Sequence, residues 1–220
     1  IRGQIVTSAR TADAILTGVF DGPLTGGRPD VIEMYFEGDV PDLTRYALGL
    51  TNDGSGPSGS VWVFPAGSAE KGSFYTLTDD ATAFTSYFGG TADASDPALA
   101  VIGRTAIELF YDADDNGDFA RGEVVDVYGE VDESGAGQPW EYTDGWAYRK
   151  SRTNVGGDIF VSSNWYTSGV GVNTGQTSNA TAPVPFPLGT FVPDPGGPKA
   201  RLQVIHNSPD PAADTVDVYV

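Results

Sequence analysis

The chain has 220 residues, 40% of them hydrophobic, so it is long and apolar enough to bury a sizeable core. Its 30 acidic residues against 12 basic ones give a formal net charge of -18, which repels nucleic-acid phosphates and anionic lipid. It contains no cysteine, and no run approaches the roughly 18 apolar residues of a membrane span. Nucleic-acid binding, membrane insertion and disulfide stabilisation are therefore not expected.

Apolar residues recur in short runs, often with a period of two, and clusters of Gly, Pro, Asn and Asp separate these runs. In the run 31–36, Ile32, Met34 and Phe36 share one face and Glu33 takes the other, as expected for a half-buried strand. Strands are predicted at residues 14–20, 31–36, 45–50, 60–64, 74–77, 98–102, 105–111, 123–129, 145–149 and 164–167. Short strands in this number predict an all-β protein built as a two-sheet sandwich.

One short helix is predicted within the segment DDATAFTSYFGG, residues 79–90. Thr78 or Asp79 is expected to cap its N-terminus, and Gly89 to end it at the C′ position. Phe84 and Phe88 then lie one turn apart on the same side of the helix. We expect them to plug one end of the sandwich.

The segment DADDNGDFARGE, residues 112–123, has the spacing of an EF-hand calcium loop. Asp112, Asp114, Asn116 and Asp118 stand at loop positions one, three, five and seven, and Glu123 stands at position twelve. Gly117 at position six permits the sharp turn that such a loop needs. Asp118 is expected to bind through its main-chain carbonyl, and Ala120 at position nine leaves room for a water molecule. The sequence therefore predicts one bound Ca²⁺.

Both flanks of this loop read as strands rather than helices. The site is therefore expected to cap a β-hairpin, with no helix pair to open, which favours a structural ion over a signalling switch. The alternative is a solvated acidic turn, because Asn-Gly pairs also occur in ordinary hairpins. Five carboxylates in twelve residues would repel one another without a cation, which favours calcium.

Catalytic motifs are poorly represented. His206 is the only histidine, and it follows a predicted linker, so a Ser-His-Asp arrangement or a histidine-ligated metal is not expected in the main domain. A glycosidase-like pair of carboxylates stays open, since acids are abundant and their separations are unknown. The acids considered are Glu108, Asp126, Asp132, Glu133, Glu141 and Asp144. We predict a protein that is not an enzyme.

The region 138–152 offers an alternative function in binding. Trp140, Tyr142, Trp146 and Tyr148 fall at even spacing, and the basic run RKSR follows from Arg149 to Arg152. Exposed aromatic rings could stack on a sugar or receive a peptide. Large aromatic residues that alternate along a strand more often pack in the core, and this interpretation is favoured.

Several segments resemble the lamin-tail-like domains of secreted bacterial proteins: ILTGVFDGPLTGGRPDVIEMYF from Ile15, RTAIELFYD from Arg104, VVDVYGE from Val124, and GQPWEYTDGWAYR from Gly137. The resemblance implies an immunoglobulin-like β-sandwich over residues 14–193 with a structural or adhesive role. The EF-hand-like loop 112–123 departs from the short hairpin turn common in the family, so calcium is predicted for this chain alone.

The rest of the chain is divided around this domain. Residues 1–13 are predicted to be an N-terminal extension, and the Pro- and Gly-rich residues 194–199 a stiff linker. Residues 200–220 resemble the opening strands of a second β domain of bacterial surface proteins, too short here to bury a core.

The function expected from these features is a non-catalytic structural or adhesive module of a secreted or cell-surface bacterial protein, stabilised by one Ca²⁺. The alternative is a carbohydrate- or peptide-binding accessory module of an extracellular enzyme. The expected partners are other domains of the same protein or neighbouring subunits, with a glycan or protein ligand under the alternative.

Overall fold

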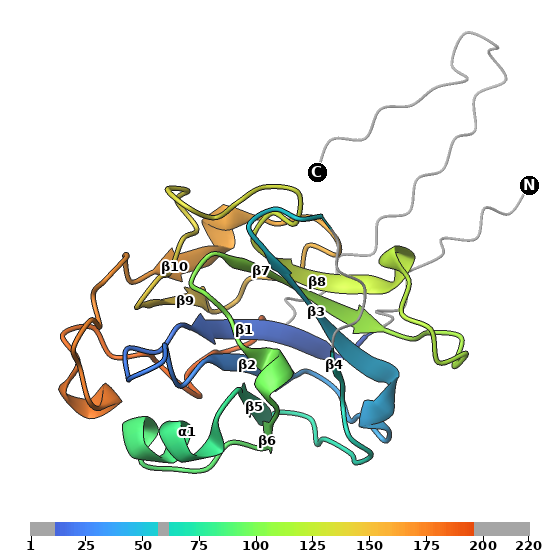
Figure 1. The fold of residues 1–220 in the computed structure, drawn as a ribbon. Helices are drawn as coiled ribbons and strands as arrows, with labels where there is room; N and C mark the ends of the chain where they lie inside the picture. The colour runs from blue at the N-terminus through green and yellow to red at the C-terminus, as the bar shows by residue number, and fades with distance from the viewer. Residues whose placement is uncertain (1–11, 57–61, 196–220) are drawn as a thin grey trace, which may run out of the picture.

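The computed structural model describes residues 12–56 and 62–195. Within them the chain is mostly β, with two sheets and a single α-helix, which confirms the prediction of a largely β protein with two sheets (Figure 1). The first 11 residues of the predicted N-terminal extension lie outside the described residues, and so do most of the predicted linker, the predicted second domain and His206.

The larger sheet has the strand order β10-β9-β1-β2-β5-β6, and the smaller sheet has the order β4-β3-β7-β8. The strands are β1 (Ala14–Phe20), β2 (Val31–Phe36), β3 (Tyr46–Asn52), β4 (Trp62–Val63), β5 (Phe74–Thr78), β6 (Ala94–Ser95), β7 (Thr105–Tyr111), β8 (Val124–Tyr128), β9 (Trp146–Arg149) and β10 (Trp165–Thr167). Neighbouring strands are antiparallel apart from β5 and β6, which run parallel.

The helical segments are short. The α-helix is α1 (Ala81–Phe88), and the 3-10 helices are η1 (Leu43–Arg45), η2 (Pro97–Leu99), η3 (Arg121–Glu123), η4 (Ser162–Asn164) and η5 (Asn179–Thr181). The strand predicted at 98–102 is wrong, because this stretch begins within η2. The Asp96 side chain caps η2 by accepting a hydrogen bond from the Ala98 N–H (2.9 Å), and Pro97 supplies a φ suited to its first turn.

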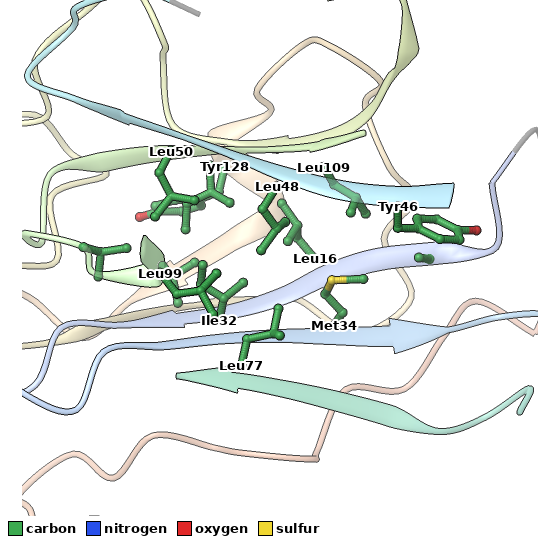
Figure 2. Packing of buried hydrophobic residues seen from close by; sticks show 14 of the residues in the cluster. Leu16, Ile32, Met34, Tyr46, Leu48, Leu50, Leu77, Leu99, Leu109 and Tyr128 are labelled. Atoms are coloured by element: carbon green, nitrogen blue, oxygen red, sulfur yellow. The ribbon is translucent and has the colours of Figure 1, made fainter. Parts of the chain in front are cut away.

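The main hydrophobic core lies between the two sheets (Figure 2). From β2, Ile32, Met34 and Phe36 contribute to it together, which confirms the face predicted from their alternation. Leu48 of β3 and Leu109 of β7 approach from the smaller sheet. Burial of these side chains holds the two sheets face to face.

The larger sheet is buried on its outer face as well, where a second apolar cluster gathers. Helix α1 and the segment 182–191 cover this face, and Phe84 and Phe186 pack with Phe20 and Trp146. The prediction that Phe84 and Phe88 plug an end of the sandwich is therefore wrong. The two rings stack on each other, with centroids 4.9 Å apart, and form part of this outer layer.

Glu33 illustrates the consequence of this extra layer. It was predicted on an exposed face, but it is fully buried, and burial raises the pKa of its carboxyl group. Its carboxylate accepts hydrogen bonds from the Thr17 hydroxyl (2.6 Å), the Tyr148 hydroxyl (2.7 Å) and the Gly189 N–H (2.5 Å). The side chain thus fastens the covering segment 182–191 to the sheet.

Helix α1 is capped by Asp80 rather than by Thr78 or Asp79, and Gly89 ends it in the left-handed conformation, as predicted. The Asp80 carboxylate accepts hydrogen bonds from the N–H groups of Thr82 (3.0 Å) and Ala83 (2.9 Å).

Asp80→Ala should lower the melting temperature by roughly 2 to 4 °C, because two N–H groups of the first turn lose their acceptor. Asp80→Asn keeps the acceptor oxygen, although it loses the charge that pairs with Arg28, and it should retain most of the stability. Thermal melting followed by circular dichroism measures the difference. Equal losses in the two variants would show that the ion pair with Arg28, and not the cap, stabilises the helix.

Candidate metal centre

The predicted calcium loop connects β7 to β8, and its first residue organises the turn. The Asp112 carboxylate is buried and accepts hydrogen bonds from the N–H groups of Asn116 (3.2 Å) and Gly117 (2.8 Å). Gly117 has a φ of 79°, a left-handed conformation that glycine adopts without strain. Burial alone would raise the pKa of Asp112, but the N–H donors of Gly117 and Asn116 outweigh it and lower the pKa. The chain therefore curls around an ionised carboxylate.

Three of the predicted ligands converge within the loop 112–123. One carboxylate oxygen from each of Asp112, Asp114 and Glu123 lies within 4.8 Å of the others. Calcium–oxygen distances of about 2.3 to 2.6 Å allow ligands of one ion to stand up to roughly 5 Å apart. The separation and the all-oxygen donor set therefore fit a hard divalent cation such as Ca²⁺.

The other two predicted ligands lie beside this group. The Asn116 amide donates to the Asp114 carboxylate (3.0 Å) and its oxygen accepts from the Asp118 N–H (2.7 Å), so Asn116 orients a ligand in the present arrangement. Asp118 is not among the converging carboxylates. Its proposed ligation through the main-chain carbonyl stays a prediction. Glu123 is held by a hydrogen bond from the Ala120 N–H (2.9 Å).

Two residues outside the predicted ligand set fix the loop to the smaller sheet. Arg45 donates from Nε (2.9 Å) and Nη2 (2.5 Å) to the Asp112 carbonyl oxygen, and its guanidinium lies over the Tyr111 ring. Phe119, inside the loop, is buried against Phe110 in a small cluster on the outer face of this sheet. Phe119 could have been noticed as the one large apolar residue among acids. No local signal links Arg45 to a loop 67 residues further along the chain.

The second candidate region, 138–152, does not present the surface that the alternative function needs. Trp140, Tyr142, Trp146 and Tyr148 are all buried, and Tyr142 is fully enclosed. This confirms the favoured interpretation that they pack in the core. They therefore provide no exposed stacking platform for a sugar or peptide.

The interpretation of residues 149–152 as a basic surface run needs a correction at its first residue. The Arg149 side chain is only 2% exposed and lies against the Asp126 carboxylate, with Nη2 2.6 Å from Oδ2. Asp126 was one of the carboxylates considered for a hydrolase, and its side chain is 1% exposed. This pair acts between strands and faces no open site.

Other acids in the considered set are engaged in local structure. Glu141 accepts hydrogen bonds from the Gly137 N–H (2.6 Å) and the Thr143 hydroxyl (2.9 Å), and Asp144 accepts from the Thr174 hydroxyl (2.8 Å). Glu133 accepts from the Gln138 amide (2.8 Å). These contacts shape the loops before and after β9.

Comparisons with known proteins add no assignment. No protein-family model matches the chain, and neither a curated protein nor a solved structure is significantly similar to it. Among the described residues, none of the helices has the length and apolar composition needed to cross a bilayer. The converging carboxylates of Asp112, Asp114 and Glu123 are thus the feature from which a function can be argued.

Proposed function

We propose that the chain is a non-catalytic structural or adhesive module of a secreted or cell-surface bacterial protein, stabilised by one Ca²⁺ in the loop 112–123. The observation that carries this proposal is the convergence of the Asp112, Asp114 and Glu123 carboxylates within 4.8 Å, in a loop with EF-hand spacing. Calcium at about millimolar concentration is typical outside cells and matches the affinity range of extracellular modules. A chain without cysteine gains from such an ion the cross-link that disulfides give other exported domains.

The immunoglobulin-like type and the lamin-tail family are part of the same proposal. The two sheets, with mostly antiparallel pairing over one shared core, are compatible with that type. The segments that carry the resemblance coincide with β1, β2, β7, β8 and β9, which include both central strands of the larger sheet. The expected partners are the neighbouring domains or subunits of the parent protein.

The attachment of the loop to the smaller sheet supports a structural role for the ion. Strands β7 and β8 pair on both sides of it, and Arg45 and Phe119 fix it to the sheet. An ion here would neutralise repulsion among carboxylates and hold the hairpin end together, with no helix pair to transmit a signal.

Calcium should raise the melting temperature of the full chain by about 3 to 10 °C. With a dissociation constant of ~0.1 to 1 mM, ~10 mM calcium adds roughly 1.4 to 2.7 kcal/mol to the free energy of unfolding. For a domain of this size, that free energy corresponds to a shift of this order. Differential scanning calorimetry in calcium and in excess chelator measures it directly.

Asp112→Ala and Glu123→Ala should abolish most of the calcium-dependent shift. Asp158→Ala removes an exposed acid outside the loop and serves as the matched control, which should keep the full shift. Identical melts of the wild-type chain in calcium and in chelator would refute the metal site. A shift that survives Asp112→Ala would place the ion elsewhere.

A further inference from the structure

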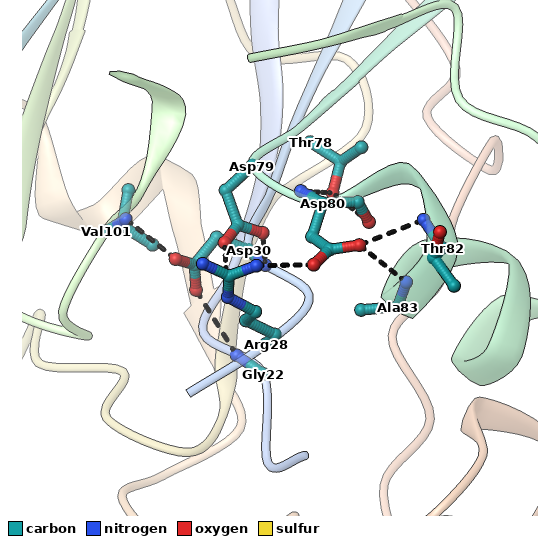
Figure 3. A network of polar contacts seen from close by, with 9 residues as sticks. All are labelled: Gly22, Arg28, Asp30, Thr78, Asp79, Asp80, Thr82, Ala83 and Val101. Atoms are coloured by element: carbon teal, nitrogen blue, oxygen red, sulfur yellow. Dashed lines mark hydrogen bonds and ion pairs between the residues drawn. The ribbon is translucent and has the colours of Figure 1, made fainter. Parts of the chain in front are cut away.

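Three buried aspartates, Asp21, Asp30 and Asp79, lie at one end of the larger sheet. Figure 3 shows two of them, Asp30 and Asp79, with their polar contacts. Asp21 follows β1, Asp30 precedes β2 and Asp79 follows β5. Because these strands are antiparallel neighbours, the three residues lie at the same end of the strands. Their exposed fractions are 6%, 2% and 5%. Carboxylates this deeply buried need a counter-charge, a metal or a proton.

Backbone N–H groups satisfy part of this need. Asp30 accepts from the N–H groups of Val101 (3.0 Å) and Gly22 (3.5 Å), and Asp79 accepts from the Asp30 N–H (2.8 Å). Asp21 accepts from the N–H of Asp144 (2.8 Å). The carboxylates therefore hold together the loops at this end of the sheet, and their protonation state affects the fold directly.

The Asp30 carboxylate accepts from the N–H of Gly22, the residue that follows Asp21, so Asp21 and Asp30 meet at this turn. Two ionised carboxylates buried at one turn repel each other, and a proton on one of them removes the repulsion. Among the described residues, neither Asp21 nor Asp30 takes part in an ion pair. The three carboxylates also do not form a close group like that of the calcium loop. A bound proton is therefore the remaining way to neutralise a negative charge on Asp21 or Asp30.

The other charged groups around the pair leave this conclusion unchanged. Arg28 is half-exposed, pairs with Asp79 (3.5 Å) and Asp80, and acts on Asp30 only from a distance. Arg104 pairs with Asp53 (2.5 Å) and likewise acts on Asp21 only from a distance. The acidic or titratable groups that act on the pair are Asp79, Asp144 and Tyr142. Their negative charges, where present, oppose a second negative charge in the pair.

We propose that the buried carboxylates of Asp21 and Asp30 together hold one proton in the folded protein, and that loss of this proton makes the fold lose stability as the pH rises above neutral. The device is independent of the calcium loop, which lies on the smaller sheet.

Burial raises the pKa of Asp30 to about 9 and that of Asp21 to about 6, and repulsion from Asp79 adds to the first shift. In the unfolded chain, aspartates ionise near pH ~4. Because the folded pKa values are raised, the stabilisation is complete below the unfolded pKa and is lost as the pH rises through the folded values. Between pH ~6 and ~9 the folded state holds one proton more than the unfolded state. The unfolding equilibrium constant should rise there by up to about tenfold per pH unit.

The test is urea unfolding of the full chain from pH 6 to pH 9 at constant calcium. The wild-type unfolding constant should rise steeply over this range. Asp30→Asn places a neutral amide that cannot ionise at this position, so its unfolding constant should rise clearly less with pH than that of the wild type. Asp158→Asn makes the same change of charge at an exposed position and should keep the wild-type slope. Parallel profiles for Asp30→Asn and the wild type would overturn the proposal.

A second measurement needs no substitution, in case Asp30→Asn fails to fold. Carboxyl carbon-13 shifts of the folded wild-type protein report each aspartate as it titrates. At least one aspartate at this end of the sheet should titrate above pH ~6. Titration of every aspartate below pH ~5 would refute the proposal that the pair holds a proton.

Discussion

Replacing Arg149 with methionine should lower the free energy of unfolding by about 3 to 5 kcal/mol, because the buried carboxylate of Asp126 is left without its counter-charge. Asp126 lies on β8 of the smaller sheet and Arg149 on β9 of the larger one, so their pair joins the two sheets. Arg149 Nη2 lies 2.7 Å from Oδ1 and 2.6 Å from Oδ2 of Asp126. The side chains are almost fully enclosed, so solvent does not screen the attraction.

The pair also completes the backbone hydrogen bonding of β1. The ladder between β1 and β9 ends at Gly18, beyond which Leu16 has no strand partner on that side. Arg149 Nε donates to the Leu16 carbonyl oxygen (2.6 Å), and the Leu16 N–H donates to Asp126 Oδ2 (3.0 Å). Loss of either side chain therefore also leaves a buried backbone group unsatisfied, which adds to the destabilisation.

Urea denaturation of Arg149→Met, Asp126→Leu and the double variant measures these effects. Removal of both charges should cost less than the sum of the single losses, because no unpaired charge then remains buried. Lys150→Met at the next, half-exposed position is the control and should change the free energy by about 0.5 kcal/mol or less. If Arg149→Met is no more harmful than Lys150→Met, the pair does not connect the sheets energetically.

Local patterns were enough to predict most strands and the convergence of three carboxylates in the loop 112–123. The alternation of Ile32, Met34 and Phe36 is set by the pleat of a single strand, and it identified their common face. All ligands of a loop with EF-hand spacing come from twelve consecutive residues, so Asp112, Asp114 and Glu123 could be placed together from spacing alone.

The features that the sequence did not reveal depend on distant partners. Glu33 is a polar residue at an alternating position. Its face is buried because helix α1 and the segment around Gly189, 156 residues further along the chain, cover it. In the sequence, Arg149 is the first residue of a basic run that predicts a surface position. In the structure it is buried against Asp126 of β8. The run 98–102 was misassigned for a local reason, since Asp96 and Pro97 favour a capped 3-10 turn over a strand.

Phe186→Ala should lower the free energy of unfolding by about 3 to 5 kcal/mol, because the ring is the centre of the layer that covers the larger sheet. Phe186 is 2% exposed, and its ring centroid lies 5.6 Å from that of Phe20, 6.1 Å from that of Trp146 and 5.5 Å from that of Tyr148. The cavity would open where β1, β9 and the covering segment meet, and the aromatic rings around it have limited room to collapse.

A substitution at Gly18 tests the same contact from the side of β1. Gly18 has no side chain, and the Phe186 ring occupies the space where its Cβ atom would lie. A Cβ atom at Gly18 would lie 2.6 Å from the Phe186 ring and 2.8 Å from the Tyr148 ring, closer than packed atoms tolerate. Gly18→Ala should therefore destabilise the wild type, but less so in the Phe186→Ala background, where one of the two clashes is removed. Val184→Ala, in the same segment but at a partly exposed position, should have a small effect. Strictly additive losses for Gly18→Ala and Phe186→Ala would mean that the ring does not rest on β1, and that the segment 182–191 is held mainly by the hydrogen bonds to Glu33 and Tyr148.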